Sequence, residues 1–229
     1  MTGGFVGFAG FGRVALVALV VAVVACGGDG TTDPSTPRAI TRVSPDSQTT
    51  AAGVKMAQPL VVLVTGGGGA PLANTPVQWT IGTGGGTLSD TTVMTDAAGH
   101  AQTTYTPGTV VMMAHVNAQA PGLTGVAFNI SLVAGPPATV QKFGSDSPAA
   151  VAGSKLTLSV RVVDAFGNPI SGSVVAWSAA TGTVSAATST ADAGGVATVQ
   201  YTLGASKGAY SLTATSGALP PVTFAITAI

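Results

Sequence analysis

Residues 164–177 read DAFGNPISGSVVAW, and a related stretch, GGGGAPLANTPVQW, occupies residues 66–79. The tryptophans that end these two stretches are 98 positions apart. A second pair of stretches, DAAGHAQTTY at residues 96–105 and DAGGVATVQY at residues 192–201, is offset by 96 positions. The chain therefore contains two copies of one module, and the two-residue difference in spacing falls within a glycine-rich loop.

Apolar and polar residues alternate at matching places in the two copies. The alternation covers residues 60–64 and 156–162 early in the copies, and residues 126–132 and 222–227 near their ends. Such a period of two is typical of strands that bury one face. Turn signals separate about seven such strands in each copy, which is the pattern of an antiparallel sandwich. The sequence predicts an all-β protein with two tandem β-sandwiches after an N-terminal signal segment.

A small set of repeated residues is expected to form the core and the turns of each sandwich. The tryptophans fall at equivalent strand positions, and the tyrosines share a strand face with inward alanines. The glycines follow an aspartate in a tight turn, where a positive φ is required. These core and turn residues are Trp79, Trp177, Gly99, Gly195, Tyr105, Tyr201, Asn168 and Pro169.

With these motifs, the chain resembles the bacterial Ig-like domains found in tandem in the invasin and intimin adhesins. The second copy carries the Asp-x-x-Gly-Asn-Pro turn at 164–169, the Val-x-aromatic strand at 175–177 and the hairpin motif at 190–197. The first copy departs from the pattern, with glycines and an alanine at 66–70. The resemblance covers about residues 38–229 and implies Ig-like sandwiches in a row on the cell envelope. It does not imply receptor binding, which in those adhesins resides in other, lectin-like domains.

The N-terminal segment is typical of a secretory signal. Twelve apolar residues, Val14 to Ala25, follow Arg13 and precede Cys26, the only cysteine in the chain. A membrane-spanning helix needs about 20 such residues, so the run favours a signal peptide. The sequence VVAC at 23–26 resembles the bacterial lipobox, which implies lipidation of Cys26. An ordinary cleaved signal with a cysteine nearby is the alternative.

These observations predict five segments. Residues 1–25 form a lipoprotein signal peptide, and residues 26–38 form the lipidated cysteine with a flexible tether rich in glycine, threonine and aspartate. Two Ig-like domains follow at 39–134 and 139–229, joined by a short proline-rich linker at 135–138. Paired prolines favour a stiff, extended backbone, so we expect the two domains to form a rod with limited bending.

The composition argues against several classes of function. Only 7% of the residues are charged and the few Lys and Arg residues are scattered, so no nucleic-acid partner is expected. Aromatic residues make up 5% of the chain, and the two tryptophans are expected in the cores rather than on a glycan-binding surface. Glutamate is absent altogether, and the aspartates fall at repeated turn positions. A general acid–base pair needs two carboxyl groups in one cleft, so the chain is not expected to be an enzyme.

Other chemical motifs are weak. Residues 204–208 match the Gly-x-Ser-x-Gly pattern around Ser206, but no aspartate, glutamate or histidine follows to complete a triad. His100 and His115 are isolated, and a zinc site would need three or four converging ligands. Neither a cofactor nor a metal is expected, although calcium bound near Asp146 and Asp164 is an alternative.

Together these features predict a non-enzymatic, lipid-anchored cell-envelope protein that presents a two-domain Ig-like rod in a structural or adhesive role. The alternative is a glycan- or protein-binding accessory lipoprotein of a larger envelope assembly. The expected partners are the membrane, through the lipid, and surface proteins or glycans. Gly27 rather than aspartate follows Cys26, which favours the outer membrane or cell surface over the inner membrane.

Overall fold

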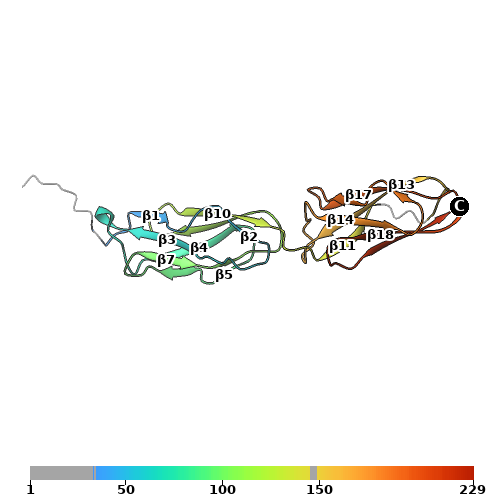
Figure 1. Ribbon diagram of the computed structural model, residues 1–229. Helices are drawn as coiled ribbons and strands as arrows, with labels where there is room; N and C mark the ends of the chain where they lie inside the picture. Colours follow the sequence, from blue (N-terminus) through green and yellow to red (C-terminus); the bar gives the residue numbers. More distant parts are fainter. Residues whose placement is uncertain (1–32, 34, 145–148) are drawn as a thin grey trace, which may run out of the picture. The chain divides into compact units, whose positions relative to one another are not determined.

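The computed structural model describes residue 33, residues 35–144 and residues 149–229, and their regular structure is almost entirely β-strand. Two groups of strands follow one another along the chain (Figure 1). We call strands β1–β10 the first sandwich and strands β11–β19 the second sandwich. The prediction of an all-β fold built from sandwiches is confirmed.

The first sandwich has a three-stranded sheet in the order β1-β3-β7, a five-stranded sheet in the order β2-β10-β9-β4-β6, and the pair β5-β8. A single 3₁₀ turn, η1 (Gly67–Gly69), follows β3. The strands of the first sandwich are β1 (Ala39–Arg42), β2 (Gln48–Ala51), β3 (Leu60–Thr65), β4 (Pro76–Thr83), β5 (Thr87–Leu88), β6 (Thr92–Met94), β7 (His100–Thr103), β8 (Tyr105–Thr106), β9 (Met113–Gln119) and β10 (Val126–Val133).

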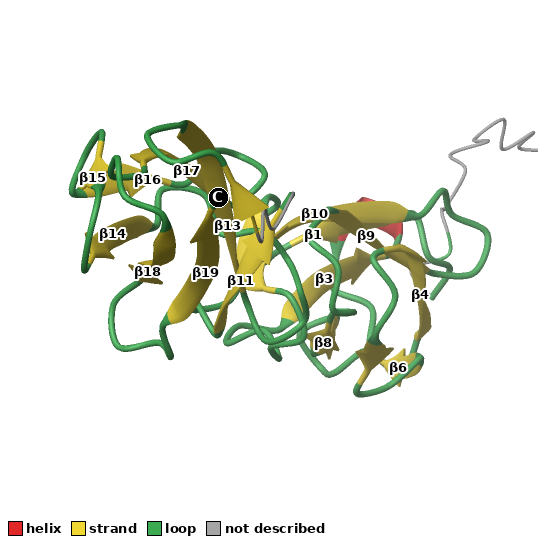
Figure 2. Cartoon of the chain, turned by 90° about the vertical axis from the view of Figure 1, so that its right-hand side faces the viewer, coloured by secondary structure: helices red, strands yellow, loops and turns green. Residues whose placement is uncertain are grey.

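The second sandwich repeats this plan with a four-stranded sheet, β11-β13-β17-β15, and a five-stranded sheet, β12-β19-β18-β14-β16. Figure 2 shows β13 and β17 in one layer and β14, β18 and β19 in the other. Its strands are β11 (Thr139–Phe143), β12 (Ala149–Ala150), β13 (Lys155–Val163), β14 (Val174–Ala179), β15 (Thr183–Val184), β16 (Thr188–Thr190), β17 (Val196–Thr202), β18 (Gly208–Thr215) and β19 (Val222–Ala228).

The described parts of the two sandwiches contain ten and nine strands, more than the seven per copy that the sequence predicts. One reason is that the opening segment of each copy divides between the two sheets. In the first copy β1 pairs antiparallel with β3, whereas β2 pairs parallel with β10. In the second copy β11 pairs antiparallel with β13, and β12 pairs parallel with β19. Each opening segment therefore contributes two short strands in place of one.

Each sandwich encloses its own hydrophobic cluster. Alternate residues of β3, at 60, 62 and 64, are fully buried, as the period of two predicts. An equivalent pair of aromatic rings fills the centre of each cluster, Trp79 with Phe128 at 6.0 Å between centroids and Trp177 with Phe224 at 6.5 Å. Burying one Val, Leu or Phe side chain contributes about 1.5–3 kcal/mol, so these clusters supply most of the stability of each sandwich.

The Asp-x-x-Gly turn is built identically in both copies. Asp192 Oδ1 accepts hydrogen bonds from the backbone N–H groups of residues 194 and 196, and Asp96 does the same for residues 98 and 100. Gly195 and Gly99 have φ values of 74° and 77°. A Cβ atom on Gly195 would lie 2.6 Å from the backbone oxygen of Val162. Glycine is required here both for the positive φ and for the close approach to the neighbouring strand.

Candidate functional site

The buried tyrosines Tyr105 and Tyr201 hold the loops that precede the Asp-x-x-Gly hairpins. The Tyr105 hydroxyl donates a hydrogen bond to the backbone oxygen of Gly85, and the Tyr201 hydroxyl donates to that of Thr181. Burial raises the pKa of both phenols above the ordinary value of 10.0. Both groups therefore remain neutral donors at physiological pH, which suits a structural role.

The second copy's turn at 164–169 is organised around one carboxylate. Asp164 is 3% exposed, and its Oδ1 accepts hydrogen bonds from the N–H groups of Phe166 and Asn168 at 2.8 and 2.9 Å. Its Oδ2 accepts from the N–H of Gly135 and from the side-chain amide of Asn168, at 3.0 and 2.9 Å. Burial alone would raise the pKa of Asp164, but the hydrogen bonds, that of the Asn168 side chain first, outweigh burial and lower the pKa below 3.8.

Asn168 also contacts the first copy, which the sequence did not predict. Its Nδ2 donates a hydrogen bond of 2.8 Å to the backbone oxygen of Thr109, and its Oδ1 accepts one of 3.2 Å from the N–H of Val111. Pro169 follows directly and forms an isolated antiparallel bridge with Val163. The Asp-x-x-Gly-Asn-Pro turn, present only in the copy that follows another one, thus satisfies backbone groups of the preceding copy.

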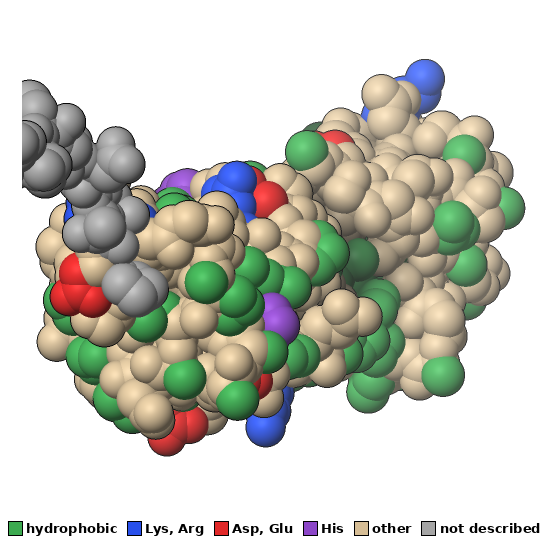
Figure 3. All heavy atoms as spheres, turned by 90° about the vertical axis from the view of Figure 1, so that its left-hand side faces the viewer, with side chains coloured by type: hydrophobic (Ala, Val, Ile, Leu, Met, Phe, Trp, Pro, Cys, Tyr) green, Lys and Arg blue, Asp and Glu red, His purple; other side chains and the backbone are tan. Residues whose placement is uncertain are grey.

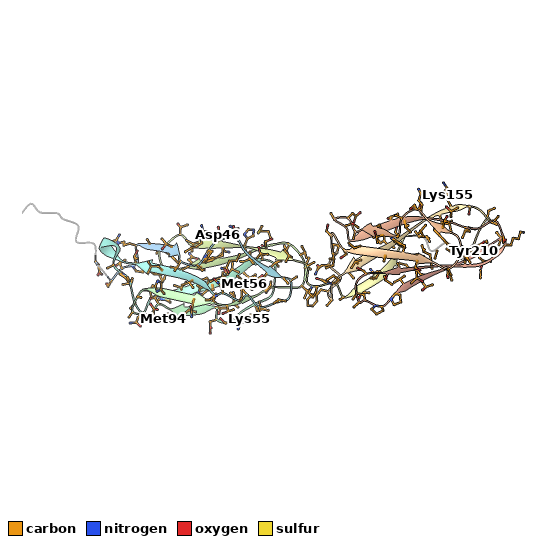
Figure 4. All side chains as sticks on the ribbon, in the orientation of Figure 1. Asp46, Lys55, Met56, Met94, Lys155 and Tyr210 are labelled. Carbon is orange, nitrogen blue, oxygen red and sulfur yellow. The ribbon has the colours of Figure 1, made fainter. Side chains whose placement is uncertain are left out.

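A second carboxylate network, partly exposed to solvent, lies in the first sandwich around Asp46, which is labelled in Figure 4. Asp46 Oδ1 accepts a hydrogen bond of 2.8 Å from the backbone N–H of Asn129, and Arg42 Nη1 lies 3.3 Å from Asp46 Oδ2. The hydrogen bond from Asn129 is the main reason that the pKa of Asp46 falls below 3.8. This network ties the segment between β1 and β2 to β10, and its oxygens are occupied by N–H donors.

The equivalent tryptophans differ in how their indole N–H groups are satisfied. Trp177 Nε1 donates a hydrogen bond of 2.8 Å to Ser189 Oγ on β16. Trp79 Nε1 is buried and has no hydrogen-bond partner. Because β6 pairs with β4 in the same register as β16 pairs with β14, Val93 occupies the place of Ser189 in the first copy. The exchange of one hydroxyl for an isopropyl group leaves a buried donor without an acceptor.

An open, largely apolar surface depression of about 530 Å³ lies beside Trp79. Beside it, β6 pairs with β4 only across residues 76–78, whereas β4 continues to Thr83. The next strand, β5, pairs with β8 and not with β4. The residues that line the depression are Trp79, Thr80, Ile81, Gly86, Thr87, Leu88 and Thr91.

The outer face of the five-stranded sheet in the first sandwich carries amide side chains. Gln78 and Gln119 lie opposite each other on β4 and β9, and Thr80 lies opposite Asn117. On the far side Asn117 faces Ala127 of β10, whose small side chain leaves a hollow. Two depressions of about 250 and 420 Å³ share Gln78 and Gln119 in their walls. Amides donate and accept hydrogen bonds, so this uncharged surface suits a neutral polar ligand.

The same face of the second sandwich carries short side chains. Ala176 and Thr215 lie opposite each other, as do Ser178 and Thr213. Thr213 also faces Thr223, with 3.4 Å between the two hydroxyl oxygens. The two copies therefore share their cores but present different chemistry on this face.

The second copy matches the model of a known protein family. A family model, the bacterial Ig-like domain (group 1), matches residues 142–227. The match covers less than half of the chain, and similarity to this family holds for that segment. The segment contains the turn, strand and hairpin motifs from which the resemblance was first inferred. No curated protein sequence matches the chain.

Solved structures of several adhesins match the chain at low sequence identity. The Escherichia coli adhesin FdeC matches 82% of this chain and 63% of its own, with 18% identity and a TM-score of 0.51. Invasin, described as a bacterial integrin-binding protein, matches 84% of this chain but only 40% of its own, with 22% identity and a TM-score of 0.40. The D0–D1 domain of intimin matches 82% of this chain and 98% of its own length, with 22% identity and a TM-score of 0.33. At these identities, the likeness to FdeC supports a shared fold and nothing more specific.

The remaining candidate residues take structural or isolated positions. Exposed Ser206 lies in the loop before β18 of the group 1 Ig-like domain, and its backbone oxygen accepts a hydrogen bond of 2.9 Å from the hydroxyl of Tyr210 (Figure 4). His100 and His115 are half-buried on β7 and β9. Cys26 and Asp146 lie outside the described residues.

Two negative findings concern the part of the chain that the structure describes. No group of three or more His, Cys, Asp or Glu side chains gathers there to hold a metal ion. Over the same residues, no helix has the length and apolar character needed to cross a membrane. Charged side chains lie in small separate groups on the face seen in Figure 3.

Proposed function

We propose that the chain is a non-enzymatic, lipid-anchored protein of the bacterial cell envelope whose Ig-like sandwiches have a structural or adhesive role. The group 1 Ig-like domain carries this proposal, together with the fold shared with the adhesin FdeC. The sequence VVAC at 23–26 after an apolar run supports lipidation of Cys26. The outer membrane or cell surface is the proposed location.

The use of the polar side chains supports a role without catalysis. Asp46, Asp96, Asp164 and Asp192 accept backbone hydrogen bonds in turns and between strands. A carboxylate held in this way is not available as a general base, which needs access to a substrate proton. The described aspartates that sequence motifs singled out thus serve the fold.

Protease shaving of intact cells that express the chain tests the anchor and the location. We expect external protease to remove the wild-type protein, and Cys26→Ser to release it from the membrane fraction. Thr31→Ser, a change in the tether outside the lipobox, is the matched control and should behave as wild type. Full protection until the outer membrane is broken would contradict the surface location, and membrane retention of Cys26→Ser would contradict the lipid anchor.

A second candidate function is the binding of a neutral glycan by the amide face of the first sandwich. Gln78, Asn117 and Gln119 surround the two depressions there, without charged side chains among the lining residues. A glycan array with the soluble chain tests this. The double variant Gln78→Ala, Gln119→Ala should lose binding, whereas Thr213→Ala on the second sandwich should retain it. Equal binding by both variants would contradict a site on this face.

A further inference from the structure

The turn at 164–169 of the second sandwich docks on one loop of the first sandwich. The Asn168 side chain donates a hydrogen bond of 2.8 Å to the backbone oxygen of Thr109 and accepts one of 3.2 Å from the N–H of Val111. Both partners are main-chain groups of the loop between β8 and β9. Docking therefore depends on the path of this backbone and not on its side chains, so a loop with the same path offers the same two groups.

A glycine beside this loop leaves room for an aromatic ring of the same turn. The Gly53 N–H donates a hydrogen bond of 2.9 Å to the backbone oxygen of Gly108, which ties Gly53 to the loop. A Cβ atom on Gly53 would lie 2.7 Å from ring carbons of Phe166. The ring thus occupies space in which another residue would carry its side chain. We call Gly53 and residues 108–111 the first socket.

The second sandwich builds the same arrangement from Gly153 and residues 204–207, which we call the second socket. The Gly153 N–H donates a hydrogen bond of 2.9 Å to the backbone oxygen of Gly204, as in the first socket. The φ values of Gly53 and Gly153 are 74° and 79°. The backbone that receives the turn in the first sandwich is therefore present again in the second.

The docking groups of the second socket are open. They are the backbone oxygen of Ala205 and the N–H of Lys207, which correspond to those of Thr109 and Val111 through the offset of 96 positions between the copies. Ala205 and Lys207 are exposed, and these two groups have no hydrogen-bond partner among the described residues. No described atom lies within 4 Å of a Cβ position on Gly153. The space that Phe166 fills in the first socket is thus unfilled in the second.

We propose that the second socket binds the Asp-x-x-Gly-Asn turn of another Ig-like module. The occupant is identified by the first socket, where a turn of this kind is already in place. The chain's own turn is engaged there, and the first sandwich has glycines and an alanine at 66–70 in place of the motif. The partner is therefore a module other than the two described here. The inference does not depend on the lipid anchor or on the location of the protein.

The end of β19 lies beside the second socket. The N–H of Ala152 donates a hydrogen bond of 3.1 Å to the backbone oxygen of Ile229, as that of Ala52 does to Val133 at 2.9 Å. Each of these bonds is formed one residue before the glycine of its socket. A module joined to Ile229 through the linker sequence would thus start from a point equivalent to Val133.

This equivalence allows a direct test. A second copy of residues 134–229, appended after Ile229, presents the turn to the second socket at a high local concentration. Amide hydrogen exchange followed by ¹H–¹⁵N spectra reports the socket, because a hydrogen-bonded N–H exchanges only when the bond opens. We expect the Lys207 N–H to exchange at least about fivefold more slowly in the extended chain than in the original chain, as expected for one added hydrogen bond.

Variants of the appended copy alone identify the atoms that dock. Asn168→Ala there should return the Lys207 N–H to its exchange rate in the original chain. Phe166→Ala, which keeps the backbone N–H bound by Asp164, should reduce the protection without abolishing it. Thr213→Ala, a change on β18 away from the turn, is the matched control and should keep the protection. Circular dichroism shows that each appended copy is folded.

The first socket provides a reference in the original chain. Asn168→Ala should speed exchange of the Val111 N–H about fivefold, because that N–H loses its acceptor, and should leave the Lys207 N–H unchanged. Equal exchange of Lys207 in the original and extended chains would overturn the proposal, as would protection that survives Asn168→Ala in the appended copy. Protection that rises with the concentration of the original chain would assign the second socket to a second copy of this chain and would also overturn it.

Discussion

The two sandwiches share their cores and differ at their edges and faces. Trp79 and Trp177 pack on equivalent phenylalanines, and the same glycine turns follow them. The indole of Trp177 has an acceptor in Ser189, whereas that of Trp79 has none. The amide face belongs to the first copy, and the Asp164–Asn168 turn belongs to the second. Residues that determine the fold have thus been kept in both copies, and residues at the surface have diverged toward different contacts.

The largest effect is expected from the shared cores. Trp79→Ala and Trp177→Ala should each destabilise their own sandwich by about 3–5 kcal/mol, because each removes a buried aromatic ring. Urea unfolding followed by circular dichroism, which reports the strands of both sandwiches, measures both losses. Val174→Ala, a change at an exposed position on β14, is the control and should alter stability little. A small loss of stability for one of the two variants would contradict the equivalence of the cores.

The glycine turns should give the next largest effect. Gly195→Ala and Gly99→Ala should each cost about 2–3 kcal/mol, because both positions combine a positive φ with a backbone oxygen within 2.7 Å of the added Cβ. Gly122→Ala tests positive φ alone, since nothing lies within 4 Å of its Cβ position. Thermal unfolding should rank the two turn variants below Gly122→Ala. Equal losses of stability at all three positions would show that the short distance between the added Cβ and the backbone oxygen is not the cause.

The turn unique to the second copy predicts a dependence on pH. Hydrogen bonds lower the pKa of folded Asp164 below its unfolded value, so its carboxylate stabilises the fold above about pH 4. That contribution is lost as the pH falls through the folded pKa. Asp164→Asn should cost about 1–2 kcal/mol at pH 7, and the difference from wild type should shrink toward pH 2.

Urea unfolding at several pH values measures this difference. Asp90→Asn, a change at an exposed aspartate, is the control and should cost less. A loss for Asp164→Asn that stays constant from pH 7 to pH 2 would contradict a role for the ionised carboxylate.

The smallest effect is expected when Ser189 of the second copy is replaced by the residue at the equivalent position of the first copy, Val93. Ser189→Val leaves Trp177 Nε1 without its acceptor and should cost about 1 kcal/mol. Urea unfolding of the second sandwich measures the loss. Ser189→Thr, which keeps a hydroxyl, is the control. If Ser189→Val left the stability of the second sandwich unchanged, the indole hydrogen bond would not account for a difference between the copies.

The sequence predicted the features that leave a periodic signal. The alternation over residues 60–64 and 156–162 predicted β3 and β13, because one buried face imposes a period of two. The two-residue strands β5 and β15 were missed because they are too short to show a period. The extra strands β2 and β12 were missed because sheet switching depends on tertiary pairing.

The candidate sites were predicted less completely, for physical reasons. Asn168 was recognised as a turn residue, but no local pattern tells which distant backbone groups its amide meets, here those of Thr109 and Val111. The free donor of Trp79 had a readable signal, because Val93 stands where the repeat has Ser189. The depression beside Trp79 had none, since its lining comes from residues of several segments that only the folded chain brings together.

The comparison between the copies rests most directly on the two indole N–H groups, and a ¹H–¹⁵N spectrum of the free protein reports both. We predict that the Trp177 proton resonates downfield, as a hydrogen-bonded indole does, and that the Trp79 proton resonates upfield of it. Ser189→Ala should move only the Trp177 signal, toward that of Trp79. Two signals of equal shift, both unchanged in Ser189→Ala, would contradict the difference between the copies.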